Sequence, residues 1–306
     1  DERIGEIIQL VSKAFTDFNK SVGSHPEVIK EEFGDEKIAS YAITGLCRSY
    51  DGYAALDGDG KVVGVTLVDV HAKGSRVATL GPVASAVPGA GRKTFEAACA
   101  HAEKLGFTTL VLLQIASNTR SFSLYAKLGF ETKHVCHHFG GFLPSSEDSP
   151  PAPADTDDLT VTVMTAVDVK ECADLFLAAH GTDCGWDRQP DIQACLESTA
   201  PYSRLVARAA DGKMVGYSTG FYGAGHQIAA SQDVFCAMFQ ESSRLHQQMG
   251  LACPSFQCPM EYPGLVKWAL KQRLTTYRAV LIMARGHYDH AWPGSGYIAA
   301  PSGLGW

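Results

Sequence analysis

A glycine-rich turn at residues 89–91 is the first place where the sequence offers chemistry. Residues 80–94 read LGPVASAVPGAGRKT, which predicts a strand, the turn Gly89-Ala90-Gly91, and a helix that begins Arg92-Lys93-Thr94. Such a turn points several backbone N–H groups at one place, beside the positive end of the helix dipole. Arg92 and Lys93 add positive charge. The segment from Gly89 to Thr94 therefore predicts a cradle for a pyrophosphate.

The glycines alone do not say which phosphate compound binds. A dinucleotide motif needs a third glycine where Thr94 stands, and a P-loop needs a glycine where Ala86 stands. Both of those interpretations fail on spacing. A plain strand-to-helix turn without any ligand is the other interpretation of the segment by itself.

A second motif follows about one strand and one helix later. Residues 118–130 read NTRSFSLYAKLGF: an Asn, a small residue three positions on, Leu-Tyr, and then Leu-Gly-Phe. The two motifs at this separation resemble the GCN5-related N-acetyltransferase (GNAT) superfamily over residues 1–143. The resemblance implies acetyl-CoA as cosubstrate, with its pyrophosphate at the glycine turn and its pantetheine and sulfur beside Asn118, Ser121, Tyr125 and Lys127.

The resemblance also implies a mechanism of direct attack by an amine on the thioester. A backbone N–H where a strand bulges, at Val83 or Ala84, is expected to stabilise the oxyanion; Pro82 has no N–H. Tyr125 stands where the family places the general acid that protonates the leaving thiolate. Packing on an amphipathic helix is the other interpretation of Tyr125.

The general base is less defined. Asp69, with His71, lies at the end of the predicted strand Val62–Val70, and Gln114 or a chain of water molecules is the alternative. Ala86 also departs from the family, which has Gln or Arg three residues before the first glycine. Two functions follow: an N-acetyltransferase for a small amine or amino-acid-like acceptor, or a CoA-binding sensor or interaction module that transfers nothing.

The elements around these motifs predict an α/β fold with a mixed sheet in each of two tandem GNAT-like domains. The first half reads α, α, β, β, β, α, β, α, β, and the second half repeats this order more faintly. Residues 144–158 carry five acidic and no basic side chains among prolines, which predicts a linker. We therefore predict a catalytic domain at 1–143, a linker at 144–158 and a degenerate domain at 159–306.

In the second half the expected CoA-binding residues are missing. Trp268 stands where the first half has Tyr125, and residues 226–240 contain no glycine turn with adjacent basic residues. We expect no CoA there. The segments Gly185–Arg188 and Gly220–His226 predict either loops that line an acceptor cleft or loops that only stabilise a domain interface.

Composition excludes several classes. The net charge is −7 and basic residues form no block, which disfavours nucleic-acid binding, and no apolar run approaches the roughly 18 residues of a membrane span. Nine cysteines without framework spacing, and no visible signal peptide, favour the cytoplasm or another reducing compartment, organelles included. His134, Cys136 and His138 alternate on a predicted strand, but without a fourth ligand we expect no metal. Nothing signals an oligomer.

Overall fold

The computed structural model describes most of the chain, in two compact units. The described residues are 3–26, 40, 43–44, 50–70, 76–144, 158–181, 187–198, 202–223, 225–288 and 297–300. Unit 1 is built from residues 1–134 and 279–288, and unit 2 from residues 135–278 and 289–304. Most of the second helix predicted for the first half, and of the linker predicted over residues 144–158, lies outside the described residues.

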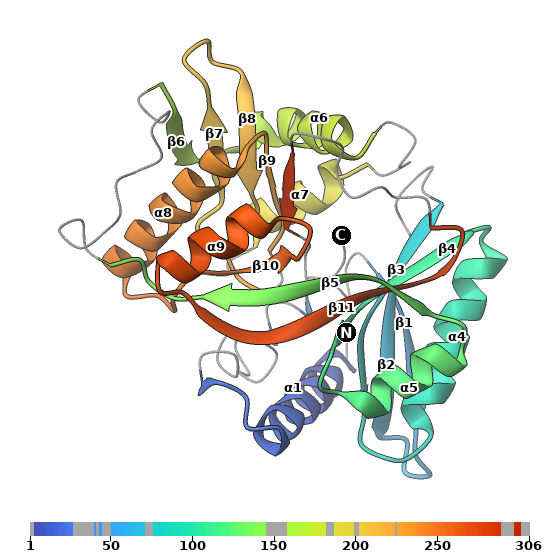
Figure 1. The fold of residues 1–306 in the computed structure, drawn as a ribbon. Helices are drawn as coiled ribbons and strands as arrows, with labels where there is room; N and C mark the ends of the chain where they lie inside the picture. The colour runs from blue at the N-terminus through green and yellow to red at the C-terminus, as the bar shows by residue number, and fades with distance from the viewer. Residues whose placement is uncertain are drawn as a thin grey trace. The chain divides into compact units, whose positions relative to one another are not determined.

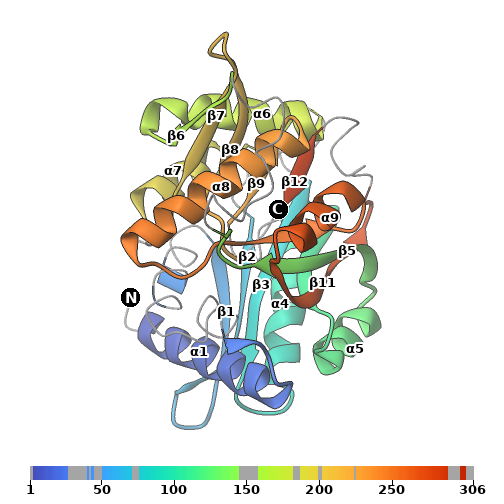
Figure 2. The same cartoon turned by 60° about the vertical axis from the view of Figure 1, so that its left-hand side comes forward.

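Unit 1 is a mixed sheet with helices on both faces (Figure 1). Its first four strands are β1 (Asp51–Leu56), β2 (Val62–Asp69), β3 (Val77–Ser85) and β4 (Thr109–Ile115), and its helices are α1 (Ile4–Ser21), α4 (Ala90–Lys104) and α5 (Thr119–Lys127). β1, β2 and β3 are antiparallel neighbours, whereas β3 and β4 run parallel. α1 and α4 pack on opposite sides of these strands (Figure 2), so every residue of β2 is buried.

Unit 2 contains a five-stranded antiparallel sheet in the order β12-β9-β8-β7-β6. The strands are β6 (Thr160–Val163), β7 (Leu205–Arg208), β8 (Met214–Ser218), β9 (Gln227–Ala229) and β12 (Ile298–Ala300); a further strand, β10, is Ser255–Pro259. The helices are α6 (Val169–His180), which follows a short 3₁₀ turn at Ala166–Asp168, α7 (Gln189–Glu197), α8 (Gln232–Met249) and α9 (Pro263–Lys271). The predicted mixed α/β architecture is confirmed.

The two halves of the sequence exchange their last strands. β5 (Glu131–Gly140) comes from the first half, yet its residues 136–140 pair with β10 in unit 2. β11 (Thr275–Gly286) comes from the second half, yet its residues 280–286 pair with β4 in unit 1. Each unit therefore includes part of a strand from the other half of the sequence, which a single division at residue 143 does not describe.

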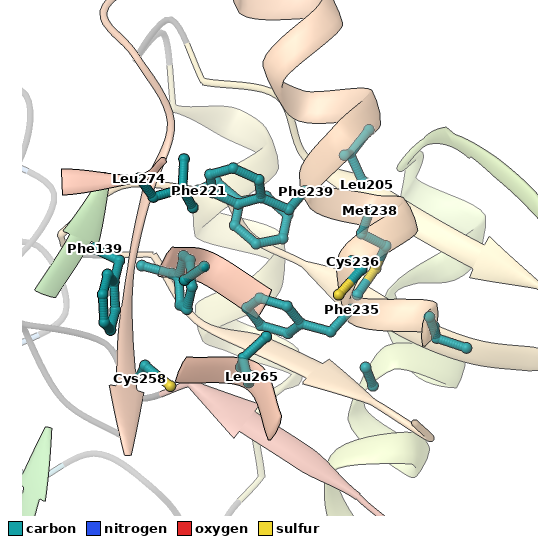
Figure 3. Packing of buried hydrophobic residues seen from close by; sticks show 14 of the residues in the cluster. Phe139, Leu205, Phe221, Phe235, Cys236, Met238, Phe239, Cys258, Leu265 and Leu274 are labelled. Carbon is teal, nitrogen blue, oxygen red and sulfur yellow. The ribbon is translucent and has the colours of Figure 1, made fainter. Parts of the chain in front are cut away.

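The core of unit 2 is rich in phenylalanine. Figure 3 shows Phe221, Phe235 and Phe239 beside Leu205 and Leu265 in one buried cluster. The Phe221 and Phe239 rings meet edge to face with their centroids 5.1 Å apart. Edge-to-face contact suits the charge distribution of aromatic rings, so the aromatic packing adds to the stability that burial alone provides.

Candidate active site

The candidate site of unit 1 begins where β3 and β4 part. Their parallel ladder covers only Val77–Thr79 and Thr109–Val111, although β3 continues to Ser85 and β4 to Ile115. Beyond Thr79 the two strands therefore no longer pair with each other. We call this divergence the splay; α4 and α5 begin just after the two strands that form it.

β3 is irregular beside the splay. Its ladder with β2 shifts between Leu80 and Val83, where β3 has two residues, Gly81 and Pro82, and β2 has only Leu67. Two residues opposite one is the arrangement of a β-bulge. The bulge expected near Pro82 is therefore present in β3.

The hydrogen bonds of β3 distinguish Val83 from Ala84 as the expected oxyanion donor. The Ala86 N–H donates to the Val63 carbonyl of β2 (2.9 Å). Because backbone groups alternate in direction along a strand, the Ala84 N–H also points to β2, whereas those of Val83 and Ser85 point to the opposite edge, toward the splay. The Ala84 N–H is therefore directed into the sheet, and the Val83 N–H remains as the expected oxyanion donor.

The glycine turn has the expected open geometry. Gly89 precedes α4 with φ +86°, a conformation that favours glycine, and a Cβ there would meet no atom within 4 Å. α4 has no acidic residue in its first turn. Arg92 is exposed and pairs with Glu96 of the same helix (2.8 Å), while Lys93 is exposed. The Ala90 N–H donates to the Val87 carbonyl (3.4 Å) and the Lys93 N–H to the Gly89 carbonyl (3.1 Å), so the amides that the first turn of α4 can offer to a ligand are those of Gly91 and Arg92.

The next residues of the segment face the sheet instead. Ala90 and Gly91 are buried, and a Cβ on Gly64 of β2 would lie 2.9 Å from the Ala90 Cβ, so Gly64 lets α4 approach the sheet. The Thr94 hydroxyl is buried, 3.0 Å from the Thr66 hydroxyl and donating to the Gly91 carbonyl (3.2 Å). The structure therefore places the Thr94 side chain under the helix rather than at the open turn. Gly64 was missed, although a glycine inside a strand signals close approach.

Tyr125 lies inside the face of the sheet that α4 and α5 cover. It is 6% exposed and its ring packs 4.8 Å from Phe95, in a cluster with Leu80 and Leu112, the residues that follow the last paired positions of β3 and β4. Burial raises the pKa of Tyr125 above its ordinary value, and a hydrogen bond with the Ser121 side chain opposes the rise. The phenol therefore stays protonated at neutral pH.

Asn118 and Ser121 hold the start of α5. The Asn118 side chain accepts the Ser121 N–H (3.1 Å), which is an N-cap. Lys127, by contrast, lies in the last turn of α5, and nine residues at 1.5 Å each place it about 13 Å along the helix from Asn118. Lys127 therefore lies at the opposite end of α5 from Asn118 and Ser121, with which the resemblance groups it.

The two candidates for the base differ in what they contact. Asp69 is 7% exposed at the end of β2, directly opposite Thr79 of β3. The Gln114 amide donates to the carbonyls of Ile115 (2.9 Å) and Asn118 (2.7 Å), so it closes the turn between β4 and α5. Gln114 is accordingly a structural residue in this arrangement. His71 lies outside the described residues.

Arg285 of β11 was not predicted at all. Its guanidinium donates to the Leu128 carbonyl (3.1 Å), pairs with Glu103 and lies 5.4 Å over the Phe130 ring. It therefore ties the C-terminal ends of α4 and α5 together. No local signal could find it, because Arg285 lies more than 150 positions along the sequence from the helices that it joins.

In unit 2 a strand occupies the position that corresponds to the splay of unit 1; we call this position the second slot. β12 pairs with β9 and also contacts β10, and the Ala299 N–H donates to the Tyr262 hydroxyl (3.3 Å). α8, which follows β9, has its first turn capped by Ser231, which accepts the Val234 N–H (3.3 Å). Trp268 packs edge to face on Phe239 (5.7 Å). The second slot thus has a peptide strand where unit 1 has the splay.

The loop over Gly220–His226 is packed on itself. The Gly220 carbonyl accepts the Gln227 amide (2.6 Å), and the His226 N–H donates to the Thr219 hydroxyl (3.0 Å). A Cβ on Gly225 would overlap the Gly220 carbonyl. These contacts hold the described residues of this loop together within unit 2. Gly185 and Trp186 of the other predicted segment lie outside the described residues.

The described part of the chain shows neither a candidate metal site nor a membrane-spanning helix. It contains no group of three His, Cys, Asp or Glu side chains placed to hold a metal ion, which covers the His134, Cys136 and His138 stretch. None of its helices combines the length and the apolar character needed to cross a bilayer.

Comparison with solved structures identifies the fold. The chain is similar to a Pyrococcus horikoshii protein named as a candidate acetyltransferase (TM-score 0.72, 12% identity, covering 100% of this chain and 93% of that one). It is also similar to a GCN5-related N-acetyltransferase of Sphaerobacter thermophilus (0.60, 15%, 93% of each chain) and to a tandem GNAT protein of the clavulanic acid pathway (0.60, 13%, 94% and 97%). No family model and no curated protein matches the sequence. The predicted two-domain GNAT fold is confirmed.

Proposed function

We propose that this chain, which has the two-domain GNAT fold, is an acetyl-CoA-dependent N-acetyltransferase whose only CoA site is in unit 1. The observation that carries the proposal is a contrast between the two units. Beyond Thr79 the edge of β3 beside the glycine turn pairs with no strand of the described residues, whereas β12 pairs with the corresponding edge of β9. An open strand edge beside a helix N-terminus suits a ligand with amide groups at one end and phosphates at the other.

The glycine turn fits the pyrophosphate of CoA. Gly89 leaves open space where any other residue would place a Cβ, and the first amides of α4 have no intrahelical acceptor. Lys93 adds a positive charge beside Arg92, which pairs with Glu96. Ala86, where the family has Gln or Arg, is compensated by these backbone donors.

The Val83 N–H would donate to the thioester carbonyl as negative charge develops on its oxygen. The amine nitrogen forms the new C–N bond, the C–S bond breaks, and the proton lost by the amine balances the proton gained by the thiolate. Tyr125 is the group that would deliver the proton to sulfur, because its buried phenol keeps its proton at neutral pH. Asp69, 7% exposed at the end of β2, is the carboxylate that would receive the proton of the acceptor.

The acceptor is a small amine or amino-acid-like molecule in this proposal, and a CoA-binding sensor is the alternative. The two are separated by following thiol release from acetyl-CoA with a panel of small primary amines. An enzyme releases CoA only when a suitable amine is present. A protein that binds CoA in calorimetry but shows no amine-dependent release with the whole panel is the sensor.

The residues of the site are tested by two substitutions. Tyr125→Phe should lower kcat more than it weakens acetyl-CoA binding, because proton delivery matters only as the thiolate leaves. Gly89→Ala should weaken acetyl-CoA binding, because alanine at φ +86° is strained and the turn must change. Full activity of Tyr125→Phe would leave Tyr125 as a packing residue.

A further inference from the structure

We propose that Thr79 and Asp69 form the subsite that receives the amino group of the acceptor, which rests on the proposed acetyl transfer. Thr79 is 3% exposed, and its hydroxyl has no hydrogen-bond partner among the described residues. A buried hydroxyl without a partner destabilises the folded state relative to a paired one. Valine would fill the same volume without that cost, so the hydroxyl calls for a reason other than stability.

The position of Thr79 supplies the reason. It is the last residue of β3 that pairs with β4, opposite Val111, and it pairs on its other side with Asp69 of β2. Residues that pair directly across a sheet point to the same face. Thr79 and Asp69 therefore stand side by side at the point where the splay opens.

The face also fits. Leu80 and Val68 lie in the cluster under α4 and α5, so their neighbours Thr79 and Asp69 point to the opposite face, on which α1 packs. The helix N-termini that would bind the phosphates belong to α4 and α5. An acyl group that passes through the splay from that side arrives on the face of Thr79 and Asp69.

The spacing leaves room for the reaction. Val83 lies four residues after Thr79, which is about 10 Å along a bulged strand. A carbonyl oxygen within about 3 Å of the Val83 N–H and an amine within about 3 Å of the Thr79 hydroxyl can share that distance. The reacting groups would then meet between Val83 and Thr79.

The chemistry selects the class of acceptor. A buried hydroxyl accepts an N–H, and a carboxylate that is 7% exposed stabilises a positive charge more strongly than it would in water. The subsite therefore suits a primary amine that arrives as an ammonium. Asp69 would take one proton before attack and pass it to water, and the second proton, which the nitrogen loses after attack, balances the one that the thiolate gains. An uncharged alcohol of the same shape can donate a hydrogen bond to Asp69 but lacks the attraction between opposite charges.

Three variants of the full chain test the subsite. Thr79→Val removes the hydroxyl and keeps the volume, Thr79→Ser keeps the hydroxyl and removes a methyl, and Ser242→Ala is the control, since Ser242 of α8 is another buried hydroxyl without a partner among the described residues. Acetyl transfer is measured with ethylamine, glucosamine, lysine and spermidine. Thermal unfolding is measured on the same samples.

Stability and activity should move in opposite directions. Thr79→Val should melt a few degrees higher than the wild type, while kcat/KM for the best amine falls about tenfold and the KM for acetyl-CoA stays the same. Thr79→Ser should melt lower and keep kcat/KM. Ser242→Ala should also melt higher but leave kcat/KM unchanged. An unchanged kcat/KM in Thr79→Val, or an equal rise in both KM values, overturns the subsite.

Failure of the proposed function is a separate result. If the wild type acetylates none of the four amines, each amine is titrated by calorimetry onto the CoA-loaded protein. Binding to the wild type and Thr79→Ser, but at least tenfold weaker to Thr79→Val, still supports the subsite. Equal binding to all three proteins, or binding to none of them, refutes it.

Discussion

Arg285→Ala should loosen a helix that lies in the other half of the sequence. Arg285 is on β11, yet its contacts are with the ends of α4 and α5 in unit 1. Removing the guanidinium removes three of these contacts at once, including the stacking on Phe130. If the strand exchange is correct, the effect must appear at α5, which carries Tyr125.

The structure gives the size of the effect. The hydrogen bond to the half-buried Leu128 carbonyl contributes about 1 kcal/mol. The pair with Glu103 contributes about 0.5 kcal/mol, since the two side chains are 25% and 55% exposed. Stacking on Phe130 contributes about 0.5 to 1 kcal/mol. The total is about 2 kcal/mol, which lowers the melting temperature of a domain of this size by about 4 to 8 °C.

Hydrogen–deuterium exchange followed by mass spectrometry locates the effect. Amides of residues 119–128 should exchange faster in Arg285→Ala by up to about 30-fold, which corresponds to about 2 kcal/mol. In Arg285→Lys the exchange of these amides should be faster than in the wild type and slower than in Arg285→Ala, because lysine keeps the charge but not the planar donor group. Arg244→Ala is the control: it removes an exposed pair with Glu241 on α8. Unchanged exchange of residues 119–128 in Arg285→Ala would refute the strand exchange.

Three further outcomes are expected. A chain that ends at residue 143 lacks β11 and should not yield a folded CoA-binding unit, which purification and circular dichroism will check. Gly64→Ala should weaken acetyl-CoA binding by displacing α4, whereas Gly58→Ala, where a Cβ meets open space, should not; calorimetry compares them. Burial lowers the pKa of His138 to about 4, whereas the pKa of histidine in the unfolded chain is near 6.5. Stability is therefore lost as the pH falls below about 6.5, and the free energy of unfolding of unit 2 should fall by about 2 kcal/mol between pH 7 and pH 5. His138→Gln should flatten that pH dependence, which urea titrations measure.

The turn before α4 and the start of α5, which the sequence predicts, have local causes. The turn at Gly89 requires a positive φ, and the N-cap at Asn118 requires a short polar side chain three residues before a free amide. Both requirements are met by neighbours in the sequence. The positions of the strands that lead into these turns follow from apolar patterns of the same short range.

The strand exchange could not be predicted in this way. β5 and β11 are both long strands with buried residues near one end, and an apolar pattern says that a strand is covered without saying by which partner. Pairing with β4 or with β10 is decided by contacts more than 100 residues apart. Arg285 follows the strand into unit 1, so it was missed for the same reason.

Side-chain direction explains the two site residues that were placed differently. Thr94 is only two positions after Arg92, but two positions turn a helical side chain by about 200°, so one points to solvent and the other into the sheet. Lys127 shares a motif with Asn118 but not an end of the helix. A motif fixes which residues are present, and helix geometry decides which of them reach one ligand.

The proposed function gives the strand exchange a role in the reaction. β12 pairs with β9 in unit 2, and the half of the sequence that forms unit 2 supplies β11 to unit 1. That strand covers the edge of β4 and brings Arg285 to the ends of α4 and α5. The second half therefore contributes to catalysis in this proposal by holding the helix that carries Tyr125, and substitutions in β11 should impair acetyl transfer although they lie in the half that binds no CoA.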